Sequence, residues 1–493
     1  MSKIIRATPG LVLLVLSTGF SQSGVWYLTR GYNRADDAWG VGVDSQGYVY
    51  WATTEWLPDS SYNDIFIYKI DSAGQELWKS QRLGGQFNEV AFIVKVKEPA
   101  VYVGGRINVS GASGNSDLLV VACEQSGDTL TRNWLYSWDL AGFYEEVDGL
   151  WVRDSAIYVS GWASPTRLDQ DIVIQKLDVN GRRLWSRVWA GTGIEGANGH
   201  LAADEQTLYI GSHYGPLNRG DGLLIAFDQD SGNYRWSETW GRPDSDDAIY
   251  GLEMSADSFL YAVGPSPMGL GIYSDINLIK FTRTGTKLWE RRWGGPRHES
   301  GRAIAIDGDS VIYIAGSTSS YGAGQGDIFV LKYNSAGTLL DYQVWGGAGD
   351  DLVYDLALAG DYLYLTGSTS SFGADGIDAL LVKVEKRTLA FPDTLLGAGE
   401  EISRGEQVCR LSVASPVFRR APVFFSIPKP ALVELTLFDL QGRKMLTLIN
   451  RQLAAGSYKV ELAPATLNTG VYFIRLKAGQ IARYRKIVVQ RQY

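Results

Sequence analysis

Apolar residues along this 493-residue chain occur in short runs separated by Gly-containing turns, and no long stretch repeats them with the period of a helix. Such runs are typical of strands, so the pattern predicts an all-β protein. One strand recurs as an Asp followed by mostly apolar residues, at intervals of 50 to 54 residues. Its seven copies begin at Asp64, Asp117, Asp171, Asp221, Asp275, Asp327 and Asp378. A period of this length predicts a β-propeller with one blade per copy.

A second marker, a Tyr in a short apolar strand, gives the same count. It recurs at Tyr50, Tyr102, Tyr158, Tyr209, Tyr261, Tyr313 and Tyr364. The last copy lacks the closing turn and Trp-containing strand of the others, but residues 24–31 match residues 184–191 in pattern and supply that strand. A ring closed in this way leaves no open sheet edge. We therefore expect a seven-bladed propeller over residues 24–389, closed by its N-terminal strand.

The repeat resembles a known bacterial family. The segments Gly326-Asp327-Ile-Phe-Val-Leu-Lys332, Trp345-Gly-Gly347 and Tyr364-Leu-Thr-Gly367-Ser-Thr369 are similar to the β-propeller repeats called SBBP. The resemblance implies an extracellular protein and supplies no active-site residues.

The N-terminus has the features of a secretory signal peptide over residues 1–23. Lys3 and Arg6 precede a short apolar run from Gly10 to Leu16, which is followed by small and polar residues. No later segment is long and apolar enough to span a bilayer, so we expect no transmembrane segment in the mature chain. The two cysteines, Cys123 and Cys409, are expected to be isolated thiols, with a disulfide between them as the alternative.

Charge divides the chain near residue 400. Residues 411–493 carry 13 Lys and Arg against 3 Asp and Glu, whereas residues 1–410 carry 33 against 51. The net charge of -8 gives no reason to expect a nucleic-acid partner. A Gly-containing linker over residues 390–408 precedes a predicted small immunoglobulin-like β-sandwich over residues 409–493.

Three motifs of this C-terminal unit resemble the type A sorting domain of the type IX secretion system. They are Leu437-Phe-Asp-Leu-Gln-Gly-Arg-Lys444, Leu467-Asn-Thr-Gly-Val-Tyr-Phe-Ile474 and Tyr484-Arg-Lys-Ile-Val-Val489. The resemblance implies handling by the type IX secretion machinery and a secreted or cell-surface location.

Acidic residues recur where one blade leads to the next. We predict that seven of them surround the mouth of the propeller channel: Asp37, Glu89, Glu146, Glu195, Asp247, Glu299 and Asp351. Carboxylates suit Ca²⁺ or another cation, although no cofactor is otherwise expected. The alternative is that one acid per repeat caps a strand or bonds to the neighbouring blade.

Other repeated residues favour structural roles. The Tyr and Trp positions could stack on sugars, but aromatic side chains at this spacing are typical of the core between blades. Asp71, Asp178 and Asn334 precede turn glycines and are expected to hydrogen-bond to their own backbone. The three histidines form no recognisable catalytic or metal-binding spacing.

These features favour a non-catalytic binding or scaffold module that recognises a protein or glycan at its surface loops. A glycan-active hydrolase or lyase is the alternative, and it requires an acid pair or an Arg group that the sequence does not single out. A quinone-dependent dehydrogenase is disfavoured by the seven-fold count and by the lack of adjacent cysteines.

Overall fold

The computed structural model has two compact units, Met1–Ala398 and Gly399–Tyr493. The structure describes residues 18–20, 24–31, 35–56, 62–84, 87–108, 116–126, 129–140, 144–166, 169–191, 201–215, 220–241, 246–268, 273–308, 310–373, 376–392, 410–413, 421–427, 429–454, 456–462, 467–468, 470–479 and 481–489. All regular elements among these residues are β-strands, and none of these residues lies in a helix that could span a membrane.

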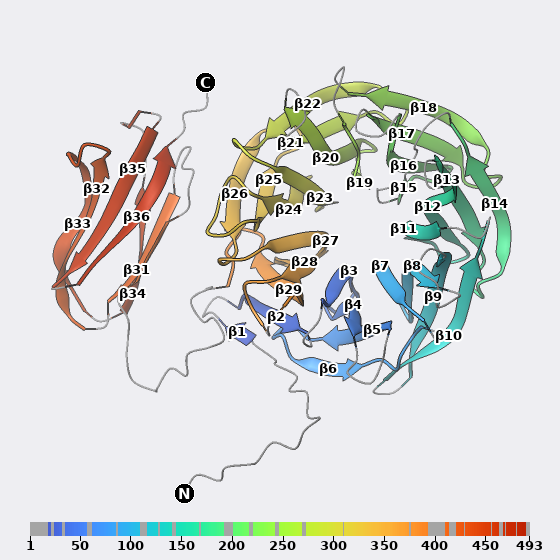
Figure 1. Ribbon diagram of the computed structural model, residues 1–493, viewed down its shortest axis with the longest axis horizontal. Coiled ribbons are helices and arrows are strands. Elements are labelled where there is room, and N and C mark those ends of the chain that lie inside the picture. The colour runs from blue at the N-terminus through green and yellow to red at the C-terminus, as the bar shows by residue number, and fades with distance from the viewer. Residues whose placement is uncertain are drawn as a thin grey trace, which may run out of the picture. The chain divides into compact units, whose positions relative to one another are not determined.

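The first unit consists of antiparallel sheets that follow one another around a ring (Figure 1). Three separate sheets take consecutive strands: β15 (Leu201–Ala203), β16 (Thr207–Tyr214), β17 (Asp221–Asp228) and β18 (Tyr234–Trp240); β19 (Gly251–Met254), β20 (Leu260–Met268), β21 (Tyr273–Phe281) and β22 (Lys287–Trp293); β23 (Glu299–Ile306), β24 (Ile312–Thr318), β25 (Asp327–Tyr333) and β26 (Leu339–Trp345). A fourth contains β3 (Asp37–Val43), β4 (Val49–Trp56), β5 (Asn63–Ile70) and β6 (Glu76–Lys79).

One larger sheet joins two four-stranded groups through a parallel contact of β9 with β11, where Ser116 pairs with Tyr144. Its strands are β7 (Glu89–Lys97), β8 (Ala100–Asn108), β9 (Ser116–Ser126), β10 (Thr129–Trp138), β11 (Tyr144–Val152), β12 (Ile157–Thr166), β13 (Asp169–Leu177) and β14 (Arg183–Trp189). Figure 1 places the first strand of each group innermost, so β3, β7, β11, β15, β19, β23 and β27 face the ring axis.

The last sheet of the unit combines the two ends of the repeat region. It contains β27 (Asp351–Ala359), β28 (Tyr362–Thr369), β29 (Asp378–Glu385), β2 (Trp26–Arg30) and β1 (Thr18–Phe20), and the sequence pattern predicts the antiparallel pairing of β2 with β29. Trp26 pairs with Lys383 and Arg30 with Ala379. Strand β1 lies within the segment expected to be a signal peptide, and the other residues of that segment lie outside the described ones.

Aromatic side chains fill the cores between neighbouring sheets, as the repeat predicts. Each marker Tyr is buried, and Tyr50 and Tyr209 pack against Trp78 and Trp236 of the outer strands. Gly232 has φ of +70°, and a Cβ there would lie 2.8 Å from the ring of Trp185 in the preceding group of strands. The structural interpretation of these aromatic residues is therefore confirmed.

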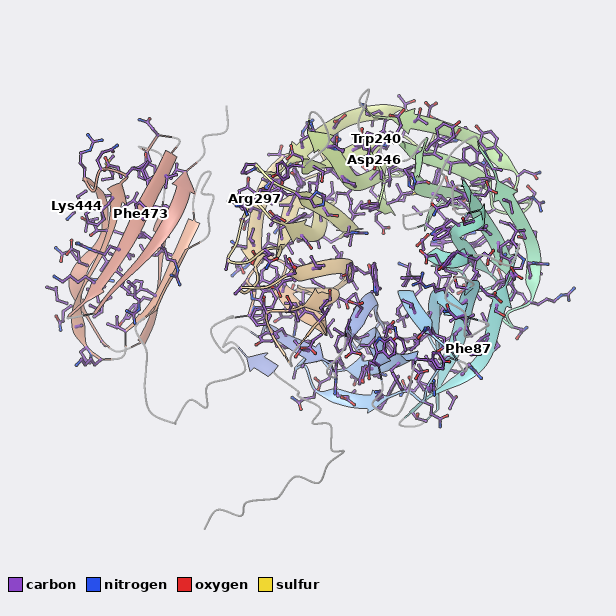
Figure 2. The ribbon with its side chains drawn as sticks, in the orientation of Figure 1. Phe87, Trp240, Asp246, Arg297, Lys444 and Phe473 are labelled. Atoms are coloured by element: carbon purple, nitrogen blue, oxygen red, sulfur yellow. The ribbon has the colours of Figure 1, made fainter. Side chains whose placement is uncertain are left out.

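The second unit has two sheets around one apolar core. The smaller contains β30 (Arg410–Val413), β31 (Ala421–Ile427) and β34 (Gly456–Leu462); the larger contains β32 (Ala431–Asp439), β33 (Lys444–Leu453), β35 (Gly470–Ala478) and β36 (Ile481–Val489). Val423 and Leu462 of the first sheet are buried in the same cluster as Leu435 and Ile474 of the second. Lys444 and Phe473, which are labelled in Figure 2, are exposed.

Candidate functional site

The turn acids form local structure, as expected. Asp71 Oδ1 accepts hydrogen bonds from the backbone N–H groups of Ala73 (2.9 Å) and Gln75 (2.8 Å). Asp178 and Asn334 make the same pair of bonds to the residues two and four positions later. Such side-chain bonds satisfy the backbone of a tight turn. The prediction that these residues are structural is therefore confirmed.

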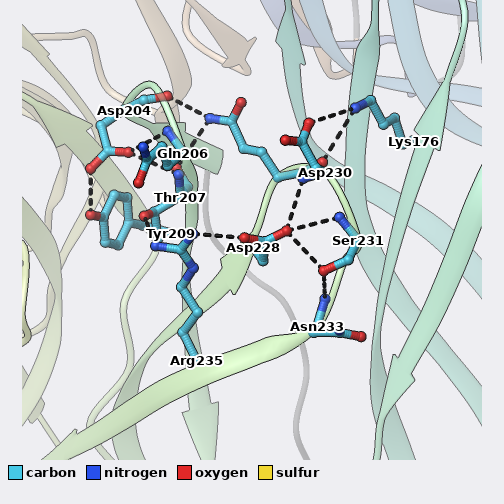
Figure 3. A network of polar contacts seen from close by, with 11 residues as sticks. Lys176, Asp204, Gln206, Thr207, Tyr209, Asp228, Asp230, Ser231, Asn233 and Arg235 are labelled. Carbon is cyan, nitrogen blue, oxygen red and sulfur yellow. Dashed lines mark hydrogen bonds and ion pairs between the residues drawn. The ribbon is translucent and has the colours of Figure 1, made fainter.

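The turn between β17 and β18 shows how these residues join a wider polar network (Figure 3). Asp228 Oδ1 accepts hydrogen bonds from Ser231, and Arg235 Nη2 donates to Asp228 Oδ2 at 2.7 Å. These donors lower the pKa of Asp228 well below its usual range. Because the donors come from the turn itself and from β18, the network stabilises the blade, and we do not regard it as a candidate catalytic site.

The repeated acids at the sheet junctions occupy one equivalent position. At a junction, the outer strand of one four-stranded group leads to the inner strand of the next. The backbone N–H groups of Asp36, Asp247 and Asp351 each donate a hydrogen bond of 2.8–2.9 Å across such a junction. The acceptor is the carbonyl just before the repeated Asp of the preceding group, which marks the third strand of that group. The side chains of Glu89, Glu145, Asp247, Glu299 and Asp351 are fully buried there.

Two of these carboxylates have hydrogen-bond donors from both sides of the junction. Asp351 accepts from Thr369, from Ser371 Oγ at 2.7 Å and from the backbone of Gly347 at 2.7 Å. Glu299 accepts from Thr318 Oγ1 at 2.8 Å and from the backbone of Gly295 at 2.9 Å. These bonds support the alternative in which the acids cap strands and connect blades. Cation binding by the seven predicted acids remains a prediction.

Asp37 and Glu146 differ from the other predicted acids that the structure describes, because each follows the junction position by one residue. Successive side chains of a strand point to opposite faces. Asp37 therefore shares the partly exposed face of β3 with Trp39, and Glu146 shares that of β11 with Asp148. Glu195 lies outside the described residues, and the neighbour of Asp247, Asp246, is exposed and accepts from the backbone of Gly220 (Figure 2).

Aromatic side chains from three neighbouring inner strands meet on this partly exposed face. The rings of Trp39 and Tyr354 stack with centroids 3.8 Å apart, and Phe92 meets Trp39 edge-on at 5.5 Å. The Tyr354 hydroxyl lies 3.0 Å from Ser368 Oγ, which also bonds to Asp37. Burial raises the pKa of Asp37. The inner face thus carries a half-buried aromatic cluster beside a carboxyl group.

A charged group continues this cluster. The Arg106 guanidinium lies 5.6 Å from the centre of the Phe92 ring, and its Nη1 atom is 3.1 Å from Glu146 Oε2. Trp162 Nε1 donates to the other oxygen of Glu146 at 3.0 Å. Burial and the charge of Glu146 raise the pKa of Asp148 well above its usual range. We call the set of Asp37, Trp39, Phe92, Arg106, Glu146, Asp148 and Tyr354 the axial strip.

The sequence pointed to only part of the axial strip. Asp37 and Glu146 were predicted as site residues, whereas the aromatic residues and Arg106 were not. The three aromatic residues come from different blades but share one position of the repeat, three residues after Asp36, Glu89 and Asp351. The residue type at this position varies from blade to blade, so only the position, which is partly exposed in β3 and β27, is a signal for them.

Among the described residues, one group of three acidic side chains is close enough to hold a metal ion. It contains Asp117, Asp139 and Glu145, and the ligand atoms lie within 4.8 Å of one another. Cys123 is buried in β9 and is a free thiol; burial raises its pKa to about 12. Cys409 lies outside the described residues, so the alternative of a disulfide is not tested.

Comparisons with known proteins bear on both units. A family model described as outer membrane protein assembly factor BamB, a propeller-type repeat, matches residues 169–374. A second, described as a secretion system C-terminal sorting domain, matches residues 422–490. The match to a propeller-type repeat does not single out the SBBP group. No curated protein matches the chain.

Several solved structures are similar to the chain at low identity. The WD40 β-propeller domain of Doa1 is 12% identical, with a TM-score of 0.36 over 61% of this chain and 85% of its own. Sqt1 from Chaetomium thermophilum is 13% identical, with a TM-score of 0.42 over 74% and 86%. The polysaccharide lyase Uly1 is 10% identical, with a TM-score of 0.43 over 70% and 89%. These values are too low to indicate a shared activity.

The described strands and the two family matches lead to one conclusion. The chain combines a propeller-type repeat region with a C-terminal sorting domain of the type IX secretion system, which directs it outside the cell or to the outer cell surface.

Proposed function

We propose that the protein is a non-catalytic binding module displayed outside the cell, and that the axial strip takes part in recognising its ligand, a protein or a glycan. The observation that carries the proposal is the contact chain from Tyr354 through Trp39 and Phe92 to Arg106. Half-buried aromatic rings and an Arg are the side chains that contribute most to binding energy at recognition surfaces. The three aromatic residues lie on inner strands and Arg106 lies on β8, and strands are rigid supports for a binding site.

We propose further that the first unit is a seven-bladed ring over residues 24–389, and that residues 409–493 form an immunoglobulin-like sandwich after a linker at 390–408. The pairing of β2 with β29 supports ring closure, and the shared core of the two C-terminal sheets supports the sandwich. A signal peptide at residues 1–23 would bring the chain to the type IX machinery.

Binding of the full-length secreted chain to a glycan array and to surface-protein extracts tests the proposal. Trp39→Ala and Phe92→Ala should each weaken the strongest interaction about tenfold, which corresponds to about 1.4 kcal/mol. Tyr234→Ala is the matched control, because Tyr234 is an aromatic residue that is 51% exposed on an outer strand. Equal affinity for the wild type and both inner-face variants would refute a role for the strip.

The axial strip also offers the acid pair that a glycan hydrolase or lyase needs. Glu146 is bonded to Arg106, and burial raises the pKa of both Glu146 and Asp148. Neighbouring carboxyl groups with perturbed pKa values are typical of acid–base catalysis. This second candidate predicts that the protein releases new sugar ends from a polysaccharide panel and that Asp148→Asn abolishes the release. Binding without any release, in the wild type, favours the non-catalytic module.

A further inference from the structure

Five outer strands end at one structural position. The Trp at the end of each pairs with the residue that follows the repeated Asp; these are Trp138, Trp189, Trp240, Trp293 and Trp345. The next residue is Gly241, Gly294 or Gly346 in three cases and Ala190 in a fourth, but it is Asp139 after Trp138. Because the register is the same, Asp139 occupies the place that a glycine has in three of the other four.

The three glycines lie against paired carboxylates. A Cβ on Gly346 would lie 2.3 Å from Asp327 Oδ1 and 2.7 Å from Asp351 Oδ2. A Cβ on Gly294 would lie 2.0 Å from Asp275 Oδ1 and 2.8 Å from Glu299 Oε2. At each of these junctions, two carboxylates therefore lie beside the glycine: that of the repeated Asp and that of the acid at the start of the next inner strand.

At the junction of β9 with β11, the equivalent pair is Asp117 and Glu145, and Asp139 adds a third carboxylate. The three ligand oxygens lie within 4.8 Å of one another. Asp117 is 7% exposed, and its Oδ1 atom has no hydrogen-bond partner. An unpartnered buried oxygen beside further carboxylates is unfavourable unless a cation neutralises it.

The residue opposite the junction acid also differs here. Thr369 and Thr318, which donate to Asp351 and Glu299, are the cross-strand partners of those acids. The cross-strand partner of Glu145 is Ala163. This junction thus has a third carboxylate, and Ala takes the place that Thr has at the other two.

We infer that Asp117, Asp139 and Glu145 bind one Ca²⁺ ion, which ties the second group of strands to the third. Ca²⁺ takes oxygen ligands at about 2.3–2.6 Å, so ligands on opposite sides of it are up to about 5 Å apart, and oxygens that lie within 4.8 Å of one another can all reach the ion. Mg²⁺, with ligands at about 2.0–2.1 Å, needs a tighter cluster. Calcium sites of extracellular proteins have dissociation constants of about 0.1–1 mM. The site is separate from the axial strip, so either proposal can fail alone.

Thermal unfolding of the full-length protein with CaCl2 or with chelator tests the inference. The wild-type midpoint should rise with Ca²⁺ concentration, because the ion binds only the folded ring. Asp139→Gly introduces the residue found at three equivalent positions and should abolish the rise, while its midpoint in chelator equals or exceeds that of the wild type. Asp230→Asn is the control, because its carboxylate is exposed and lies beside Lys176.

A luminescence measurement with Tb³⁺ provides a readout independent of stability. Trp138 directly precedes Asp139, so light absorbed by this indole should sensitise a bound Tb³⁺ ion. Added Ca²⁺ should displace the signal, Mg²⁺ should do so only at much higher concentration, and Asp139→Gly should lack it. The inference is wrong if added Ca²⁺ does not change the unfolding midpoint of the wild type. It is also wrong if Ca²⁺ raises the midpoint of Asp139→Gly as much as that of the wild type.

Discussion

Single residues at the blade contacts combine a backbone requirement with a packing requirement. Gly232 has a positive φ, and the Trp185 ring covers the space that a side chain needs. Gly47 has φ of +86°, but nothing lies within 4 Å of a Cβ built on it. Substitutions at the two positions therefore distinguish the free-energy cost of the left-handed conformation from the cost of the contact with Trp185.

Gly232→Ala should lower the free energy of unfolding more than Gly47→Ala does. Both substitutions place a side chain in the left-handed region, which costs about 1–2 kcal/mol. Only Gly232→Ala also displaces the Trp185 ring, which adds about 1–3 kcal/mol of overpacking. Urea unfolding of the two variants measures the difference, and equal losses would show that the Trp contact adds nothing.

Asp327 should make stability depend on pH. Burial is the main reason that its pKa rises from 3.8 to about 6. The folded state therefore holds this proton more tightly than the unfolded state, so stability is lost as the pH rises from about 4 to above 6. Asp327→Asn should be about 1–2 kcal/mol more stable than the wild type at pH 7.5 and about equal to it at pH 4.

Urea unfolding in chelator at the two pH values gives this comparison. Asp361→Asn is the control, because Asp361 is exposed on the next sheet. A stabilisation by Asp327→Asn that is the same at both pH values would contradict the assignment of the raised pKa to this carboxyl group.

Residue spacing identified the turn acids and the buried aromatic residues, because each recurs once per blade. It could not separate Asp36 from Asp37 or Glu145 from Glu146. Adjacent acids lie on opposite faces of a strand, and the exact register depends on the neighbouring sheet. The first of each pair lies at the junction and the second on the partly exposed inner face.

At the level of elements, the repeat predicted most strands of the first blade to within a few residues. The strand expected to begin at Asp64 is Asn63–Ile70, and the strand expected around Tyr50 is Val49–Trp56. The strand expected within residues 24–31 is Trp26–Arg30. In the C-terminal unit, β30 is short and pairs only with β31, so the sequence pattern does not single it out.

Removal of β2 should destabilise the whole ring. Trp26 and Tyr27 are each 1% exposed, and β2 covers the edge of β29. A chain that begins at Asp37 should aggregate or lose cooperative unfolding, because an open sheet edge pairs with other chains. A chain that begins at Gly24 is the control and should unfold like the full ring. Equal solubility and stability of both chains would refute the closure proposal.

At the level of the whole molecule, the C-terminal unit should act as a sorting signal whose function does not depend on the propeller. Deletion of Tyr484–Tyr493 removes most of β36, including the buried residues Ile487 and Val489. In a host with the type IX machinery, the propeller should then remain folded but stay in the periplasm. Cell fractionation and limited proteolysis check location and folding. Secretion at the normal level would contradict this prediction.

The pairing of β2 with β29 also has a consequence for the order of folding. Trp51 Nε1 bonds to Thr366 across 315 residues, and Trp26 pairs with Lys383 at the far end of the repeat region. During vectorial synthesis and export, β2 lacks its partner β29 until the end of the repeat region arrives. A chain that is cut short before residue 378 therefore lacks both the strand that completes the ring and the sorting domain. Completion of the fold and eligibility for surface delivery thus depend on the same late part of the chain.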